Sequence, residues 1–290
     1  MAGASVIGRL GLYAQLVRLD KPIGTLLLLW PTLWALWAAG RGRPDLTVLV
    51  IFVAGTFLMR AAGCAMNDYF DRGFDLHVER TKARVLTSGL IRPKEALLVA
   101  GTLALLAFLL VLKLNALTIY LSFVALLLAA TYPLMKRLFG MPQAYLGIAF
   151  GFGIPMAFAA LTNEVPPVAW VLLLANIFWT IAYDTEYAMV DRDDDIKLGL
   201  KTAAITFGQF DVLAIAICYV AAIALLGYAG YLMAWGLAFY TGLLIALGLA
   251  VTHVRWIRER DRSACFRAFR HNNWFGAAVF GGIVAQYLLA

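Results

Sequence analysis

An apolar run that passes directly into an acidic cluster decides the fold of this chain. Residues 46 to 75 read LTVLVIFVAGTFLMRAAGCAMNDYFDRGFD. The part from 46 to 66 holds one charged side chain, Arg60, and is long enough to cross a roughly 30 Å hydrocarbon core as a helix. The part from 67 to 75 carries Asn67, Asp68, Asp71 and Asp75. The stretch therefore predicts a membrane-spanning helix that ends in a carboxylate cluster at the membrane surface.

Similar apolar runs recur along the whole chain. The 290 residues are 63% hydrophobic and only 14% charged, which is far from the composition of a soluble domain. Nine segments are long and apolar enough to span a bilayer: 23–39, 46–66, 96–113, 116–134, 144–162, 168–184, 207–228, 231–252 and 274–290. The predicted fold is all-α, a polytopic membrane protein. We expect one domain over residues 1–290, a single bundle of nine transmembrane helices with a central cavity open to the cytoplasm.

The basic residues predict the orientation of this bundle. With the N-terminus in the cytoplasm, the inner segments hold 20 Lys and Arg residues and the outer segments hold 3. This asymmetry predicts a cytoplasmic N-terminus and, with nine spans, a C-terminus on the outer side. Residues 1–22 then form an amphipathic segment on the inner surface, because apolar side chains recur there at helical spacing. The net charge of +7 is explained by orientation, so nucleic-acid binding is not expected.

Two acidic clusters at equivalent places in two halves of the chain predict a metal site. Residues four apart on a helix drift by only about 40°, so the side chains of each cluster form one stripe. The first stripe is Asn67, Asp71 and Asp75, beside Asp68; the second is Asp184, Asp191 and Asp195, with Asp193 pointing away. Crowded carboxylates repel one another, and a bound cation compensates them. Ligands that are all oxygen favour Mg²⁺ or Ca²⁺ over zinc.

Basic residues on the same side of the membrane indicate what else this site binds. The candidates are Arg80, Lys82, Arg84, Lys136, Arg137, Lys197 and Lys201. Metal-binding acids beside phosphate-binding cations suit a diphosphate bridged by Mg²⁺, because Mg²⁺ takes one or two carboxylates and completes its shell with phosphate oxygens and water. Simple positive-inside placement is the alternative for each of these cations.

Arg60 is a separate signal, because it lies inside an apolar span. It precedes Asn67 by seven residues and is offset from it by about 20° around the helix, so it points into the same cavity two turns deeper. Burying an unpaired Arg costs at least about 2.5 kcal/mol. We therefore expect a carboxylate partner from the protein or from a substrate, and snorkelling towards the headgroups is the alternative.

At these positions the chain resembles the intramembrane aromatic prenyltransferases, and within them the bacterial 4-hydroxybenzoate polyprenyltransferases of ubiquinone synthesis. The resemblance covers nearly the whole chain. It rests on RLDKPIGTLLLLWP at 18–31, RAAGC at 60–64, the acidic motif at 67–75, and YDTEYAMVDRDDD at 183–195.

The resemblance implies a reaction and a set of roles. A polyprenyl group leaves its diphosphate with the help of Mg²⁺ and joins 4-hydroxybenzoate at the carbon ortho to the hydroxyl. Asn67, Asp71 and Asp75 would bind one face of the metal diphosphate and Asp191 and Asp195 the other, with Asp68 and Asp184 as supporting ligands. Arg60 would bind the benzoate carboxylate. The phosphate contacts would come from Arg80, Arg84, Lys136, Arg137 and Lys201. The resemblance also implies the inner membrane of a bacterium, with the C-terminus in the periplasm, and no protein partner.

Two alternatives stay open on the residues alone. One alternative is a different aromatic acceptor, such as a naphthoate or a tetrapyrrole, because the acidic motifs concern only the donor; Arg60 favours an acceptor that is an anion. A cation transporter also uses membrane carboxylates, but transport predicts acids near the midplane and needs no adjacent phosphate-binding cations.

Overall fold

The computed structural model describes residues 6–79 and 81–289, and the described chain is helical with no β-strand. The helices are α1 (Val6–Leu16), α2 (Ile23–Ala39), α3 (Leu46–Asp75), α4 (Pro93–Val111), α5 (Ala116–Leu138), α6 (Pro142–Gly151), α7 (Gly153–Thr162), α8 (Pro167–Lys197), α9 (Ala203–Phe207), α10 (Asp211–Leu232), α11 (Leu237–Trp256) and α12 (Arg262–Leu289), with a 3₁₀ turn at Gly208–Phe210. This confirms the predicted all-α fold.

The helices fit a protein that crosses a membrane several times. Seven helical segments of the described chain are long and apolar enough to span one: α3, α4, α5, the α6–α7 pair, the segment from α9 to α10, α8 and α11. The other two predicted spans are also helical, but α2 is apolar over only 17 residues. The first half of α12 carries Arg262, Arg267 and Arg270. The multi-pass fold is therefore confirmed, and the number nine stays a prediction.

Local sequence signals set the ends of several helices. Asp45 caps α3 by accepting a hydrogen bond from the amide of Val48 at 3.0 Å, and Asn115 caps α5 by accepting one from Thr118 at the same distance. Proline occupies the first turn of α4, α6 and α8, where its missing N–H is not needed. These caps leave short connections between neighbouring helices.

The predicted span 144–162 is divided into α6 and α7 at Phe152. Pro155 lies in the first turn of α7 and cannot donate the hydrogen bond that a continuous helix would make to the carbonyl of Gly151. On α6, Gly147 touches α8, because a Cβ there would lie 2.8 Å from Cα of Ile177. Gly147 and Gly151 are four residues apart, a spacing of small residues that lets two helices approach closely.

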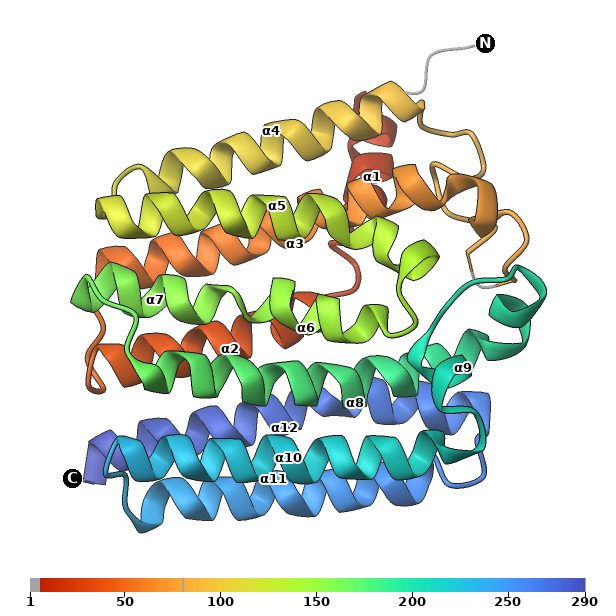
Figure 1. Cartoon of the computed structure of the whole chain (residues 1–290). Helices are drawn as coiled ribbons and strands as arrows, with labels where there is room; N and C mark the ends of the chain where they lie inside the picture. The colour runs from red at the N-terminus through yellow and green to blue at the C-terminus, as the bar shows by residue number, and fades with distance from the viewer. Residues whose placement is uncertain (1–5, 80, 290) are drawn as a thin grey trace.

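The bundle brings the two acidic helices to the same end of the molecule. In Figure 1, α3 and α8 belong to different halves of the chain, yet both run into irregular connections at the end of the bundle that carries α9. Both helices also continue well beyond the apolar runs predicted to end at 66 and 184, so that the acidic residues lie on regular helix. A helical stripe of carboxylates is thereby formed in each half.

Candidate active site

One large cavity, of about 1680 Å³, lies between the two halves of the bundle. Its lining includes every residue of the two motifs that is predicted to bind the metal diphosphate: Asn67, Asp68, Asp71, Asp75, Asp184, Asp191 and Asp195. Apolar residues of α2, α3, α5 and α7 continue the lining away from these acids. The cavity thus has an acidic end and a long apolar part, which suits a ligand with a charged head and an apolar tail.

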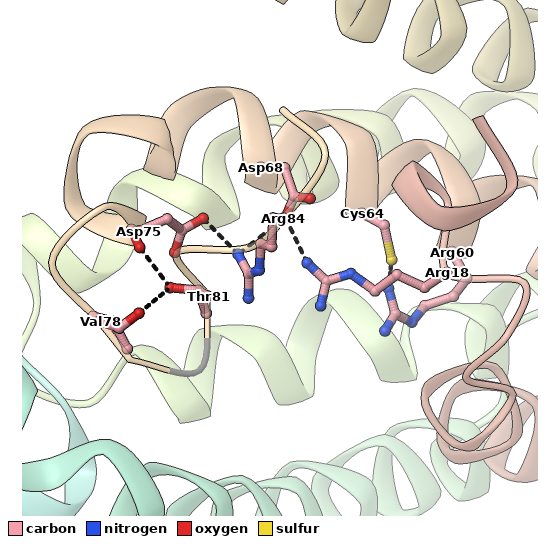
Figure 2. Close-up of polar contacts among 8 residues, drawn as sticks. All are labelled: Arg18, Arg60, Cys64, Asp68, Asp75, Val78, Thr81 and Arg84. Atoms are coloured by element: carbon pink, nitrogen blue, oxygen red, sulfur yellow. Dashed lines mark hydrogen bonds and ion pairs between the residues drawn. The ribbon is translucent and has the colours of Figure 1, made fainter. Parts of the chain in front are cut away.

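The acids of α3 are buried and are compensated by guanidinium groups. Asp68, Asp71 and Asp75 are each at most 6% exposed. Arg84 places Nη1 3.0 Å from Oδ1 of Asp68 and 2.6 Å from Oδ2 of Asp75 (Figure 2). Arg18, from the segment between α1 and α2, places Nη2 2.5 Å from the same oxygen of Asp68. Two cations from outside α3 therefore balance its buried carboxylates.

Arg18 illustrates how strong this compensation is. Burial is the largest single influence and opposes the charged form of its side chain, but Asp68, Cys64 and Tyr187 together outweigh burial, and the pKa of the Arg18 guanidinium lies above its ordinary value. Arg18 also has a positive φ of 58°, a backbone conformation that few residues other than glycine adopt. The turn before α2 is thus shaped so that Arg18 reaches the acidic end of the cavity.

The acids of α8 are more open. Asp184, Asp191 and Asp195 are partly exposed and line the cavity. Asp193 is exposed, lies outside the cavity lining and pairs with Arg262 at 2.9 Å. The predicted stripe and its exception are both confirmed in their placement.

A buried polar network holds α8 from the side opposite its acids. Glu186 is fully buried and accepts hydrogen bonds from the Tyr219 hydroxyl and from Nδ2 of Asn272, both at 2.9 Å. The Tyr219 hydroxyl also lies 3.0 Å from Nδ1 of His253, whose Nε2 lies 3.0 Å from Nδ1 of His271. These residues belong to α8, α10, α11 and α12. Such a satisfied network fixes the rotation of α8 against three other helices.

A second anchor lies at the end of α8. Asp211 begins α10 and is fully buried, and its carboxylate pairs with Arg192 of α8 at 3.2 Å and with Arg260 at 2.7 Å. The hydrogen bonds to Asp211 hold the pKa of Arg260 above its ordinary value. Arg192 follows Asp191 directly, so this cluster also orients the second acidic stripe.

Arg60 lines the cavity, as its position in α3 predicted. Its guanidinium donates to Sγ of Cys64, one turn along the helix (Figure 2), while its Nε is buried without a hydrogen-bond partner in the described chain. Among residues 6–79 and 81–289, no carboxylate forms an ion pair with Arg60. Gly24 of α2 makes room for the guanidinium, because a Cβ at Gly24 would lie 2.7 Å from Nε of Arg60.

The predicted phosphate-binding cations fall into three groups. Arg84 lines the cavity. Arg80 and the side chain of Lys136 lie outside the described residues. Arg137 and Lys201 lie outside the cavity lining, where Arg137 donates to the carbonyl of Phe70 at 2.8 Å and Lys201 to that of Leu138 at 3.5 Å. Roles for these last four residues stay predictions.

Lys82 and Lys197, the other two candidate phosphate-binding cations, both pair with neighbouring acids. Lys82 lies 2.6 Å from Glu79, and Lys197 lies 3.9 Å from Asp194. Sequence reasoning assigned no role to Arg18, although its position directly before the first span is a signal that it faces the cytoplasmic end of the cavity. Arg267 and Arg270 of α12 also line the cavity and were missed.

The donor set fits a hard divalent cation. All side chains on the two stripes offer oxygen only, which suits Mg²⁺. Within the described residues, no three His, Cys, Asp or Glu side chains meet closely enough to hold a metal by themselves. A metal at this site would therefore complete its shell with oxygen atoms from a ligand and from water, as Mg²⁺ does when it binds phosphates.

Fold and site together define a multi-pass helical membrane protein in which two acidic helices face one cavity. The pattern of the UbiA prenyltransferase family matches residues 28–276, and the chain belongs to this family.

Similar proteins support the same assignment over nearly the full length. A 4-hydroxybenzoate octaprenyltransferase of Cupriavidus pinatubonensis is 63% identical over 281 residues, which cover 97% of this chain and 99% of that protein. The protein of the same name from Thiobacillus denitrificans is also 63% identical over 281 residues, with 97% and 96% covered.

Solved structures share the fold at lower identity. The apo structure of a UbiA homologue from Aeropyrum pernix K1 has a TM-score of 0.79 at 23% identity, with 89% of this chain and 96% of that chain covered. A UbiA homologue from Archaeoglobus fulgidus bound to GPP and Mg²⁺ has a TM-score of 0.70 at 18% identity, with 94% and 99% covered.

Proposed function

We propose that this protein transfers a polyprenyl group from polyprenyl diphosphate to the ring carbon of 4-hydroxybenzoate that is ortho to the hydroxyl, with Mg²⁺ as cofactor. The observation that carries the proposal is the meeting of two carboxylate stripes, from α3 and α8, at one end of a single cavity. The names of the bacterial relatives and the GPP and Mg²⁺ bound by the homologue from Archaeoglobus fulgidus support it.

The donor head would bind at the acidic end of the cavity. Asn67, Asp71 and Asp75 would hold one face of the metal diphosphate and Asp191 and Asp195 the other, with Asp68 and Asp184 as supporting ligands. Mg²⁺, when bound, neutralises the diphosphate and makes it a better leaving group.

The cations of the site would bind the remaining phosphate oxygens. Arg84 already lies between two of the acids, and its fork of donors suits a phosphate oxygen that arrives beside them. Arg80, Lys136, Arg137 and Lys201 are proposed for the same role on sequence alone. The apolar part of the cavity would take the prenyl tail and exclude water from the allylic carbon.

The acceptor would bind deeper, at Arg60. A carboxylate there would satisfy a guanidinium that has no acidic partner in the described chain, and charge-assisted hydrogen bonds of this kind are strong. The C–O bond of the donor breaks, the electron pair leaves with the diphosphate, and the ring carbon forms the new C–C bond. The proton on that carbon is then lost, which restores the aromatic ring.

We also propose a location in the bacterial inner membrane with the N-terminus in the cytoplasm and the C-terminus in the periplasm. The asymmetry of Lys and Arg between the two sides supports this orientation. It places both acidic stripes, and so the diphosphate, on the side where a water-soluble head group is available.

The test is a product assay with the purified full-length protein. Mg²⁺, a long-chain prenyl diphosphate and radiolabelled 4-hydroxybenzoate are expected to give label in an apolar product, and EDTA is expected to abolish it. Release of diphosphate without labelled product would show that the acceptor is another aromatic compound. No release at all, together with cation uptake into vesicles, would contradict the prenyltransferase function.

A further inference from the structure

Tyr183 is a buried hydroxyl group in the cavity wall that the proposed roles do not use. It lies on α8 directly before Asp184, is 1% exposed and lines the cavity. Its hydroxyl has no hydrogen-bond partner among residues 6–79 and 81–289. Thr180, one turn earlier, has its hydroxyl close by but outside hydrogen-bonding geometry, and that hydroxyl is unpartnered as well. Buried hydroxyl groups in proteins normally have a partner, so this one calls for a ligand.

Packing prevents Tyr183 from turning away to find a partner. Its ring meets the ring of Trp179 edge-on, with centroids 5.2 Å apart, and meets Phe269 of α12 at 6.2 Å. Trp179 is fully buried and donates to Asn272, so it belongs to the anchored side of α8. The position of the Tyr183 hydroxyl is therefore set by the same contacts that set the acidic stripe.

Tyr183 and Arg60 line the same cavity. Arg60 precedes Asn67 by seven residues on α3, and Tyr183 precedes Asp191 by eight residues on α8, so Arg60 lies about two turns from Asn67 and Tyr183 about two turns from Asp191. Arg60 and Asp184 are also close enough to act electrostatically on the Tyr183 hydroxyl. The Nε of Arg60 and the hydroxyl of Tyr183, both without a hydrogen-bond partner in the described chain, thus belong to one polar site, to which α3 and α8 each contribute a side chain.

We propose that Tyr183 binds the hydroxyl group of the aromatic acceptor while Arg60 binds its carboxylate. This inference rests on the proposed function and adds a residue that determines specificity. A ring with a carboxylate and a hydroxyl at opposite ends is held at both, so it cannot rotate freely, and a carbon ortho to the hydroxyl is presented to the donor. Tyr183 makes and breaks no covalent bond. It selects acceptors that carry a hydroxyl opposite the carboxylate.

The test is a double-mutant type of thermodynamic cycle, in which Tyr183→Phe removes the hydroxyl of the protein and benzoate replaces 4-hydroxybenzoate to remove the hydroxyl of the ligand. The full-length protein is purified in detergent with Mg²⁺ and a prenyl thiolodiphosphate, and the Kd values of 4-hydroxybenzoate and benzoate are measured by calorimetry for the wild type and for Tyr183→Phe. The wild type is expected to bind 4-hydroxybenzoate about tenfold more tightly than benzoate, and Tyr183→Phe is expected to bind the two within about twofold. Binding of the thiolodiphosphate reports that the variant is folded.

Tyr240→Phe is the matched control. This substitution also removes one hydroxyl, but Tyr240 lies outside the cavity lining. In the wild type the Tyr240 hydroxyl donates to the carbonyl of Gly227 at 3.2 Å. This variant is expected to keep the preference of the wild type. If Tyr183→Phe keeps that preference too, the inference is overturned while the proposed function stands. If the wild type does not bind 4-hydroxybenzoate, the proposed function fails and the inference fails with it.

Discussion

The two acidic stripes face the same cavity but are held in different ways. On α3 the carboxylates are buried, and cations from outside the helix, Arg18 and Arg84, contact them directly. On α8 the carboxylates are partly exposed, and the helix is fixed from its far side by the network around Glu186. The first stripe is therefore a site of charge compensation, and the second is a site of rigid placement.

This difference indicates how a charged ligand enters. With a metal diphosphate bound, Asp68 and Asp75 would hold the cation in place of the guanidinium groups, and Arg84 would donate to the phosphate oxygens. The helix that carries the α8 acids is oriented by Glu186 and Asp211. We therefore expect the α3 half to adapt to the ligand and the α8 half to form a fixed wall.

The largest expected effect is a loss of turnover when one carboxylate is neutralised, and we expect it to be the same for either stripe. Asp71→Asn and Asp191→Asn should each lower turnover by about a thousandfold, because each removes charge that holds the metal diphosphate. The measurement is the rate of product formation by protein that is folded in detergent. Asp193→Asn is the control, since Asp193 belongs to the same motif but points away, and its rate should stay within about twofold. A variant of one stripe with near-normal turnover would show that only the other stripe binds the metal.

The next effect concerns the deep end of the α3 wall. Arg60→Ala should raise the KM for the acceptor by about a hundredfold and leave the KM for the donor nearly unchanged, because a charge-assisted contact to the carboxylate is lost. Gly24→Ala should act in the same direction but more weakly, since the added Cβ meets the guanidinium. Steady-state kinetics with each substrate varied in turn measure both. An unchanged acceptor KM in Arg60→Ala would return Arg60 to a structural role.

A smaller effect, on the KM for the donor, is expected for a cation that contacts the α3 acids. Arg84→Gln should raise the KM for the donor by about tenfold, because one phosphate contact is lost and the buried Asp68 and Asp75 lose a positive neighbour. Arg137→Gln is the comparison, because Arg137 lies outside the cavity lining. Equal effects of the two substitutions would contradict the special place of Arg84.

The smallest effect on the catalytic rate is expected for a substitution in the network that holds α8. Glu186→Ala removes one buried hydrogen-bond acceptor from the Tyr219 hydroxyl and one from the Asn272 amide, and should lower the free energy of unfolding by about 2 kcal/mol. The rate of the folded fraction should fall by less than about threefold. Thermal unfolding in detergent and the rate at saturating Mg²⁺ measure the two effects. An unchanged unfolding temperature would mean that the network does not anchor α8.

The sequence predicted the parts of this structure that follow from periodicity. The stripes on α3 and α8, the outward Asp193 and the inward Arg60 all follow from 3.6 residues per turn. The composition and the length of the apolar runs predicted the all-α membrane fold.

The remaining features depend on contacts between distant segments. Arg18 and Asp68 are 50 residues apart, and Glu186 and Asn272 are 86 apart. No local pattern in the sequence pairs such residues, because the pairing arises only when the helices pack. The break at Phe152 was missed for a different reason, since Pro155 was taken as part of one continuous apolar span.

The central claim is that both stripes together hold one metal diphosphate. It is tested most directly by titrating a prenyl thiolodiphosphate into the wild type, Asp71→Asn and Asp191→Asn by calorimetry, each with Mg²⁺ and again with EDTA. We predict binding to the wild type that requires Mg²⁺ and is at least about tenfold weaker in each variant. Wild-type affinity in either variant, or equal binding in EDTA, would contradict the claim.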